Sequence, residues 1–270
     1  MNEVNKTLYI PLYGKAQVSR KGIILDDPAA ERIWAAEGFP ARGKSRSKWL
    51  AYNMAMRARV FDDWTDLMLE EHKDALVLQI GCGLDSRCER VSRPFRLWID
   101  GDLPEVIALR ESYYSRSERY RMQPLNAAAP EQLEALPDSE TAVIVLEGLC
   151  MYLTNELLYA LLGTLQKKYP EIHVLMDVYT VFGARASRVK NPVNDVGVTR
   201  LYGVDDLKRL LGDLPIRIVA EHSFTPGKLI GELDPAEQAF FRVLFTGKTY
   251  RKIYRLYELE SSSPAISVFQ

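Results

Sequence analysis

The stretch Leu76-Val-Leu-Gln-Ile-Gly-Cys-Gly-Leu-Asp-Ser-Arg87 decides the fold of this chain. Its first five residues form a short apolar run that is typical of a buried strand. Gly81 and Gly83 follow directly, and a helix is expected from about Asp85. Two glycines after a strand remove side chains where the backbone turns sharply and can lie against a ligand. The same pattern also fits an ordinary strand-to-helix turn, so it does not establish a nucleotide site alone.

Acidic residues end two later strand-like runs. Phe95-Arg-Leu-Trp-Ile-Asp100 is followed by Asp102, which lies about 20 residues beyond the glycine turn. A carboxylate at that position can bind the ribose hydroxyls of a nucleoside, or it can cap the helix that Pro104 begins. A third run, Thr141-Ala-Val-Ile-Val-Leu146, is followed by Glu147. Because parallel strands end at one edge of a sheet, these residues predict one shared ligand site.

Strand-like and helix-like segments alternate after residue 75. This alternation predicts an α/β fold with a mostly parallel, Rossmann-like sheet and helices on both faces. The expected strands are residues 76–80, 95–100, 119–125, 141–146, 172–177 and 216–220, with a terminal antiparallel hairpin from 254–259 and 266–269. The expected helices are residues 85–91, 104–115, a short one from Pro130, 154–168, 204–211 and 235–245. Residues 178–203 show little periodicity and are expected to form a substrate-side loop.

The first 74 residues carry little strand character. Helices are expected at residues 28–36, 45–56 and 58–71, separated from one another by short breaks. Such a helical segment cannot join a parallel sheet, so it is expected to cover the strand ends. The predicted organisation is therefore a helical N-terminal cover at 1–74 and a ligand-binding core at 75–270.

Composition excludes several classes of protein. A chain of 270 residues with 47% hydrophobic and 26% charged residues is typical of one globular α/β domain. The net charge of −1 gives no sign of nucleic-acid binding, and no apolar run approaches the roughly 18 residues of a membrane span. Three cysteines and no export signal predict a cytoplasmic protein. No metal site is expected, because the three histidines are isolated in the sequence: His72, His173 and His222.

Three strings of this sequence resemble successive motifs of the leucine carboxyl methyltransferase family, in particular its bacterial branch of polyketide O-methyltransferases. The resemblance extends from residue 7 to about residue 180. It implies a class I methyltransferase fold and S-adenosylmethionine (SAM) as the cofactor. The strings are Leu78-Gln-Ile-Gly-Cys-Gly-Leu-Asp-Ser-Arg87, Trp98-Ile-Asp-Gly-Asp-Leu-Pro-Glu-Val-Ile107 and Leu146-Glu-Gly-Leu-Cys-Met-Tyr-Leu-Thr154.

The resemblance implies a set of SAM-binding residues. Lys15 and Arg59 resemble the basic pair that holds the methionine carboxylate, a role that suits charge-assisted hydrogen bonds, although either could be a surface cation. Gly81 and Gly83 are expected to let SAM pass close to the backbone, and Asp102 to bind its ribose.

Glu147 is placed by its motif to meet the ammonium group of the methionine part, or to be the buried partner of an arginine. The segment after the third strand departs from the family pattern, which offers a polar or acidic pair to the adenine. Leu125 and Asn126 are expected there instead, through the backbone and the side-chain amide.

On the acceptor side the expected residues are Tyr152, Arg200 and Tyr202, although Tyr152 could equally pack in the core. No residue is assigned to catalysis. A carboxylate acceptor is already ionised and needs no general base, whereas a phenol or alcohol must lose a proton.

The predicted function is a SAM-dependent O-methyltransferase that acts on a carboxylate or hydroxyl of a small molecule, such as a polyketide or another secondary metabolite. The alternatives are methylation of a protein C-terminal carboxylate and a SAM-binding protein without turnover. A nicotinamide-dependent oxidoreductase is disfavoured because Ser86 stands where the third glycine of the dinucleotide-binding pattern would be.

Overall fold

The computed structural model describes residues 7–38, 47–187 and 200–261. Within these residues the chain forms a seven-stranded sheet with the order β3-β2-β1-β4-β5-β7-β6. Strands β1 to β5 pair in parallel, and β7 is antiparallel to both of its neighbours. The strands are β1 (Leu76–Ile80), β2 (Leu97–Asp102), β3 (Tyr120–Pro124), β4 (Thr141–Leu146), β5 (Glu171–Tyr179), β6 (Arg217–His222) and β7 (Tyr254–Ser261). The predicted α/β fold class is confirmed.

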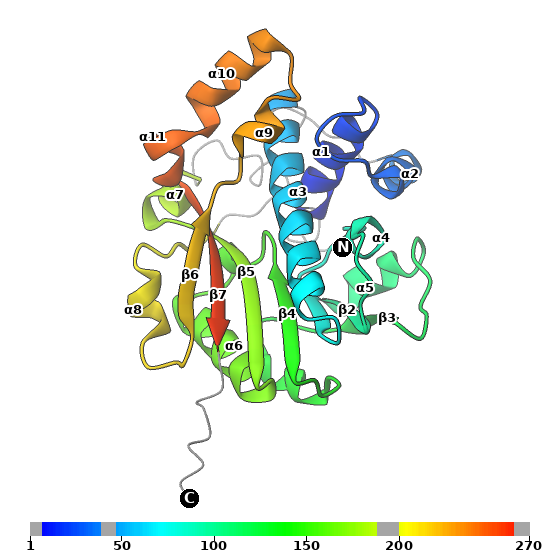
Figure 1. The fold of residues 1–270 in the computed structure, drawn as a ribbon, viewed down its shortest axis with the longest axis vertical. Coiled ribbons are helices and arrows are strands. Elements are labelled where there is room, and N and C mark those ends of the chain that lie inside the picture. The colour runs from blue at the N-terminus through cyan, green and yellow to red at the C-terminus, as the bar shows by residue number, and fades with distance from the viewer. Residues whose placement is uncertain (1–6, 39–46, 188–199, 262–270) are drawn as a thin grey trace, which may run out of the picture.

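Helices cover both faces of the sheet (Figure 1). The α-helices are α1 (Tyr9–Ser19), α2 (Pro28–Glu37), α3 (Lys48–Glu71), α4 (Arg87–Arg90), α5 (Pro104–Arg110), α6 (Asn155–Lys168), α7 (Val181–Ala186), α8 (Leu207–Leu211), α9 (Gly227–Ile230), α10 (Pro235–Phe245) and α11 (Gly247–Arg251). The described residues also form the short 3₁₀ helices η3 (Pro130–Ala135) and η4 (Cys150–Tyr152). Among the described residues, none of these helices combines the length and apolar character that a membrane crossing requires.

Alternate residues of each central strand enter two different cores, as the period of two in a strand requires. Val77 and Val143 pack with Phe61 and Trp64 of α3 on one face. On the other face, Leu78 and its neighbours in β4 and β5 pack against the leucines of α6. Both faces are apolar, which is why these strands appear in the sequence as continuous hydrophobic runs.

The N-terminal helices differ from the expectation in two ways. The helices expected at 45–56 and 58–71 form one continuous helix, α3, because neither glycine nor proline interrupts it. Helix α1 was not expected, since Pro11 and Gly14 lower its helix propensity. Packing compensates for that propensity: a Cβ atom at Gly14 would lie 3.2 Å from the Ala51 backbone, so the glycine allows α1 to approach α3 closely.

Helix α3 links the strand ends to the face of the sheet. Its C-terminal half packs against the sheet, whereas its N-terminal half lies beside α1 at the carboxyl ends of the parallel strands (Figure 1). The division of the chain at residue 74 stays a prediction, since α3 contributes to both parts.

The last strands form an antiparallel edge, but not through the pairing that was expected. Strand β7 occupies the expected segment 254–259 and lies between β5 and β6. The other expected hairpin strand, 266–269, is outside the described residues, as are residues 188–199 of the expected loop 178–203. The described start of that loop contains α7, which the Thr180 hydroxyl caps by accepting a hydrogen bond from the Gly183 N–H group at 2.9 Å.

Candidate active site

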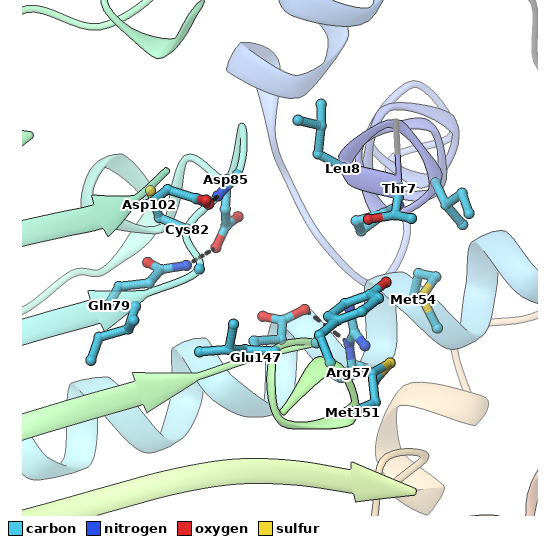
Figure 2. Close-up of a pocket in the computed structure, with 18 of the residues that line it drawn as sticks. Thr7, Leu8, Met54, Arg57, Gln79, Cys82, Asp85, Asp102, Glu147 and Met151 are labelled. Carbon is cyan, nitrogen blue, oxygen red and sulfur yellow. Dashed lines mark hydrogen bonds and ion pairs between the residues drawn. The ribbon is translucent and has the colours of Figure 1, made fainter. Parts of the chain in front are cut away.

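A cavity of about 530 Å³ lies at the carboxyl ends of the parallel strands, within the size range of small-molecule sites. Helices α1 and α3 contribute to its wall together with the segments that follow β1, β2 and β4. Figure 2 shows Asp102, Glu147 and Arg57 around this space. Gly81 and Gly83 also line it, so the residues predicted from three separate motifs come together in one cavity.

The turn after β1 requires its glycines. Gly81 and Gly83 have φ angles of 73° and 52°, in the left-handed region that other residues rarely adopt. A Cβ atom at Gly81 would lie 3.0 Å from the Leu149 side chain. The Gly81 N–H group donates to the Gly101 carbonyl at 2.7 Å, which fixes the turn against the end of β2. The backbone therefore forms this part of the cavity wall, as predicted.

Asp102 follows this turn at the end of β2. Its carboxylate accepts hydrogen bonds from the N–H groups of Gly83 and Leu103, both at 2.7 Å. Leu103 is the N-cap residue of α5, which begins at Pro104, so Asp102 does not occupy the N-cap position that was considered as an alternative. Burial raises the pKa of the Asp102 carboxyl, and the two backbone hydrogen bonds only partly offset this effect.

Glu147, directly after β4, is paired with two arginines. Its carboxylate accepts a hydrogen bond from Arg57 Nε at 2.9 Å and another from a terminal nitrogen of Arg87. The alternative of a buried arginine partner is therefore realised, while the residue still lines the cavity.

Arg57, rather than Arg59, carries the arginine charge into the cavity. Arg59 lies on the outer side of α3, where it pairs with Asp63 at 2.7 Å and donates to the Ile24 carbonyl at 3.2 Å. Arg57 is buried on the opposite side and binds Glu147. The prediction for Arg59 is thus not met by the geometry. Two positions along a helix correspond to about 200° of rotation, so the two side chains face different ways.

The Arg57 guanidinium also connects to the far strands of the sheet. One terminal nitrogen donates to Asp177 Oδ2 at 3.1 Å and to the Tyr254 hydroxyl oxygen at 2.9 Å. The Asp177 carboxylate in turn accepts a hydrogen bond from the Gly148 N–H group at 2.7 Å. Burial raises the pKa of Asp177, and the charge of Arg57 opposes that change. Arg57 therefore joins α3 to the ends of β4, β5 and β7.

Lys15 is buried in the cavity wall, as the resemblance implied, and its ammonium group is bonded to Asp85. The Asp85 carboxylate also accepts a hydrogen bond from Gln79 Nε2 at 2.9 Å. Burial acts to raise the pKa of Asp85, but Arg87, Arg90 and Lys15 outweigh it and hold the pKa well below its usual range. Lys15 is thus held by an ionised carboxylate at the edge of the cavity.

These pairs belong to one network of charges around the cavity. The ion pairs connect five carboxylates with four cations, of which Asp85, Glu147, Lys15 and Arg57 line the cavity. Asp102 adds a third carboxylate to the wall. This excess of negative charge suits a cationic ligand. The paired carboxylates are Asp27, Asp62, Asp85, Glu147 and Asp177, and the cations are Lys15, Arg57, Arg87 and Arg90.

Leu125 and Asn126 lie in the cavity wall after β3. The Leu125 N–H group donates to the Asp102 carbonyl at 2.8 Å, which places the segment beside the end of β2. The Asn126 side-chain oxygen accepts a hydrogen bond from the Ala128 N–H group at 2.9 Å and so shapes the turn. Contact of these residues with adenine stays a prediction.

Of the three residues predicted on the acceptor side, only Tyr152 lines the cavity. The Arg200 guanidinium lies 5.1 Å from the centre of the Tyr202 ring, and neither side chain reaches the cavity wall. The Tyr202 N–H group donates to the Met151 carbonyl at 2.8 Å, so this segment supports the wall from behind. The expectation for Arg200 and Tyr202 is corrected accordingly.

Sequence reasoning missed most of the residues in this part of the cavity. They come from the helices α3, α10 and α11 and from the strands β5 and β7, where no motif was recognised. The alternation along β7 could have indicated that Tyr254 faces the same side as Leu256. The missed residues are Asn53, Tyr179, Phe245, Tyr250 and Tyr254.

The strand order, the antiparallel β7 and a cavity at the carboxyl ends of the strands define the class I methyltransferase fold. Solved structures share this fold. Magnesium protoporphyrin IX methyltransferase from Synechocystis, determined with bound S-adenosylhomocysteine, matches with a TM-score of 0.50 at 12% identity, over 87% of this chain and 93% of that one. A SAM-dependent methyltransferase from Clostridium acetobutylicum matches with a TM-score of 0.51 at 11% identity, over 75% and 91%.

The chain belongs to the leucine carboxyl methyltransferase family, whose model matches residues 13–166. It is 28% identical to the tetracenomycin polyketide synthesis O-methyltransferase TcmP of Streptomyces glaucescens, over 87% of this chain and 88% of that protein. It is 33% identical to the SAM-dependent methyltransferase dpfgK of Gibberella zeae, over 78% of each. The expected family and enzyme class are confirmed, and the cofactor is SAM.

Arg57→Ala should weaken SAM binding by at least about tenfold, because Glu147 and Asp177 lose the shared guanidinium that holds their carboxylates in place at the cavity. Arg59→Ala is the matched control on the same helix and should bind SAM as the wild type does. Calorimetric titration with SAM measures both, and circular dichroism checks that each variant is folded. If the alanine variant unfolds, the same titration is made with Arg57→Lys, which keeps the charge but not the guanidinium group. A loss of binding in Arg59→Ala alone would overturn this assignment.

SAM affinity should depend on pH through Asp102. The ionised Asp102 carboxylate accepts hydrogen bonds from the ribose hydroxyls. The affinity for SAM should therefore be constant above the raised pKa of Asp102 and fall, by up to about tenfold per pH unit, below that pKa. The stability of the free protein changes the other way, because protonation relieves the buried charge. Titrations from about pH 4 to 8 test this, with Asp102→Asn as a weak, pH-independent control. Parallel pH curves for the two proteins would contradict the role of Asp102.

Proposed function

We propose that this enzyme transfers the methyl group of SAM to a carboxylate of an aromatic, polyketide-like small molecule. The observation that carries the proposal is a group of aromatic side chains in the cavity wall, which we call the acceptor part of the cavity. Rings of this kind offer a large apolar surface with a polar edge. They are Tyr152, Tyr179, Phe245, Tyr250 and Tyr254. The relative TcmP is an O-methyltransferase of polyketide synthesis, which supports the same substrate class.

The rest of the cavity, lined by the turn after β1 and by Asp102, Lys15 and Glu147, fits SAM in this proposal. Gly81 and Gly83 have no side chains to obstruct a ligand, and Asp102 presents a carboxylate to the ribose. Lys15 and Glu147 are of opposite charge and match the carboxylate and the ammonium of the methionine part. SAM brings a methyl group that its cationic sulfur has already activated. The residues of the chain therefore contribute position and electrostatic complementarity rather than covalent chemistry.

The cavity favours an acceptor that is already ionised. None of the three histidines, all within the described residues, lines it. Burial raises the pKa of Tyr152 to about 12, with its hydrogen bond to Thr7 acting in the opposite direction, and burial also raises the pKa of Tyr250. Both tyrosines therefore keep their hydroxyl protons at neutral pH and cannot act as a general base. A carboxylate needs no such base, whereas an alcohol does.

Enclosure favours a small acceptor over the C-terminus of a protein. Leu8 and Pro11 of the N-terminal segment and Leu50 and Met54 of α3 contribute to the cavity wall above the strand ends. A folded protein would have to thread its terminus beneath these helices. A small aromatic acid has no such requirement.

Methyl transfer from isotope-labelled SAM to a panel of acceptors tests the proposal. Aromatic carboxylic acids should be labelled as methyl esters, which release methanol in mild alkali. Phenols, alcohols and C-terminal peptides should remain unlabelled. Exclusive labelling of phenols would refute the carboxylate acceptor, and exclusive labelling of C-terminal peptides would refute the small-molecule acceptor. Tight SAM binding without transfer to any class would favour a protein without turnover.

Leu50→Trp provides a matched variant within this experiment. Leu50 is half-buried on the first turn of α3 and lines the cavity one turn before Asn53. The indole ring of tryptophan at position 50 should fill the acceptor part of the cavity. Turnover should then be lost, while the affinity for SAM changes less than about twofold. If SAM affinity falls together with turnover, the two parts of the cavity are not separate sites.

A further inference from the structure

Two of the histidines that are isolated in the sequence lie together in the structure. His72 is the residue at the C-terminal end of α3, and His173 lies in β5. Their ring centres are 4.3 Å apart, and Glu171 lies beside both. The expectation that the histidines form no cluster is therefore corrected. We propose that His72, Glu171 and His173 bind a divalent transition-metal ion, with zinc as the best match.

The separations between the donor atoms suit one ion. His173 Nε2 lies 3.3 Å from Glu171 Oε1, and His72 Nδ1 lies 4.0 Å from Glu171 Oε2. One ligand atom from each of the three residues can be chosen so that all lie within 4.8 Å of one another. Bonds of about 2.0 to 2.2 Å to a tetrahedral zinc place ligand atoms roughly 3.4 Å apart. The histidine–carboxylate pair on β5 already has this separation, and His72 needs only a small movement.

The local structure explains why these residues converge. Glu171 and His173 are two positions apart on a strand, so their side chains project from the same face. That face is the one covered by α3, whose last turn brings His72 across to β5. His72 has left the helical conformation, with a φ of −122°, and is half-buried. It can therefore adjust its ring, whereas His173 is buried and fixed.

The carboxylate is prepared to act as a ligand. The Thr141 hydroxyl donates to Glu171 Oε2 at 2.7 Å, a contact that orients the carboxylate as outer-shell partners do in metal sites. Two imidazoles and one carboxylate form a known zinc donor set that leaves one position for water.

The site is remote from the methyl-transfer cavity. Glu171 begins β5, whereas Asp177, which binds Arg57, lies near its other end. The two residues are six positions apart along the strand, or about 20 Å. A metal ion here would join the end of α3 to the start of β5 and stabilise that contact. It would take no part in methyl transfer, so the inference does not depend on the proposed function.

Titration of the full chain with zinc tests the inference, using protein that was freed of metal by a chelator and carries no histidine tag. One ion per chain should bind with a micromolar or tighter dissociation constant and raise the melting temperature. Magnesium, which prefers oxygen ligands, should do neither. Cobalt should bind at the same place and give the visible absorption of a low-symmetry site.

Variants separate this site from adventitious binding. His72→Gln and Glu171→Gln should each weaken zinc binding by at least about tenfold. His222→Gln is the matched control, since His222 pairs with Glu258 at 2.6 Å and is outside the proposed ligand set. Circular dichroism of the metal-free variants checks folding. Absence of saturable zinc binding up to about 1 mM would overturn the inference. Equal effects of His72→Gln and His222→Gln would also overturn it.

Discussion

The pairing of Glu147 with Arg57 and Arg87 is the interaction on which the rest of the site depends. Arg57 comes from α3, Arg87 from the helix after the glycine turn, and Glu147 from the end of β4. A buried charge that loses its partner is strongly destabilising, so these three segments must meet at one place. The pairing therefore holds the N-terminal half of α3 over the strand ends, where it closes the cavity.

Much of the site is predictable because its signals are local. The glycines at 81 and 83 follow an apolar strand directly, and their φ angles require glycine. Asp102 and Glu147 each follow the next strand-like run in the same way. Because parallel strands end at one edge, the fold class alone brings these residues together. The resemblance then adds SAM, which the residues by themselves do not specify.

The rest depends on contacts between distant segments. Arg59 was expected from a motif resemblance, which does not show which side chain of α3 faces the cavity, and the structure places Arg57 there instead. The acceptor part uses Tyr179 and Tyr254, which come from strands without a recognised motif. His72 and His173 are about one hundred residues apart in the chain, and only the docking of α3 on β5 brings them together. Apart from the alternation along β7, these contacts leave no periodic or short-range signal.

A crystal structure with S-adenosylhomocysteine, the product of methyl transfer, tests the central claim most directly. The account predicts that the ribose is bound by Asp102, that the amino-acid end lies between Lys15 and Glu147, and that the pairs of Glu147 with Arg57 and Arg87 remain intact. The sulfur should face the aromatic part of the cavity. A product bound elsewhere, or bound only after α3 has moved away and Glu147 has lost both arginines, would contradict the account.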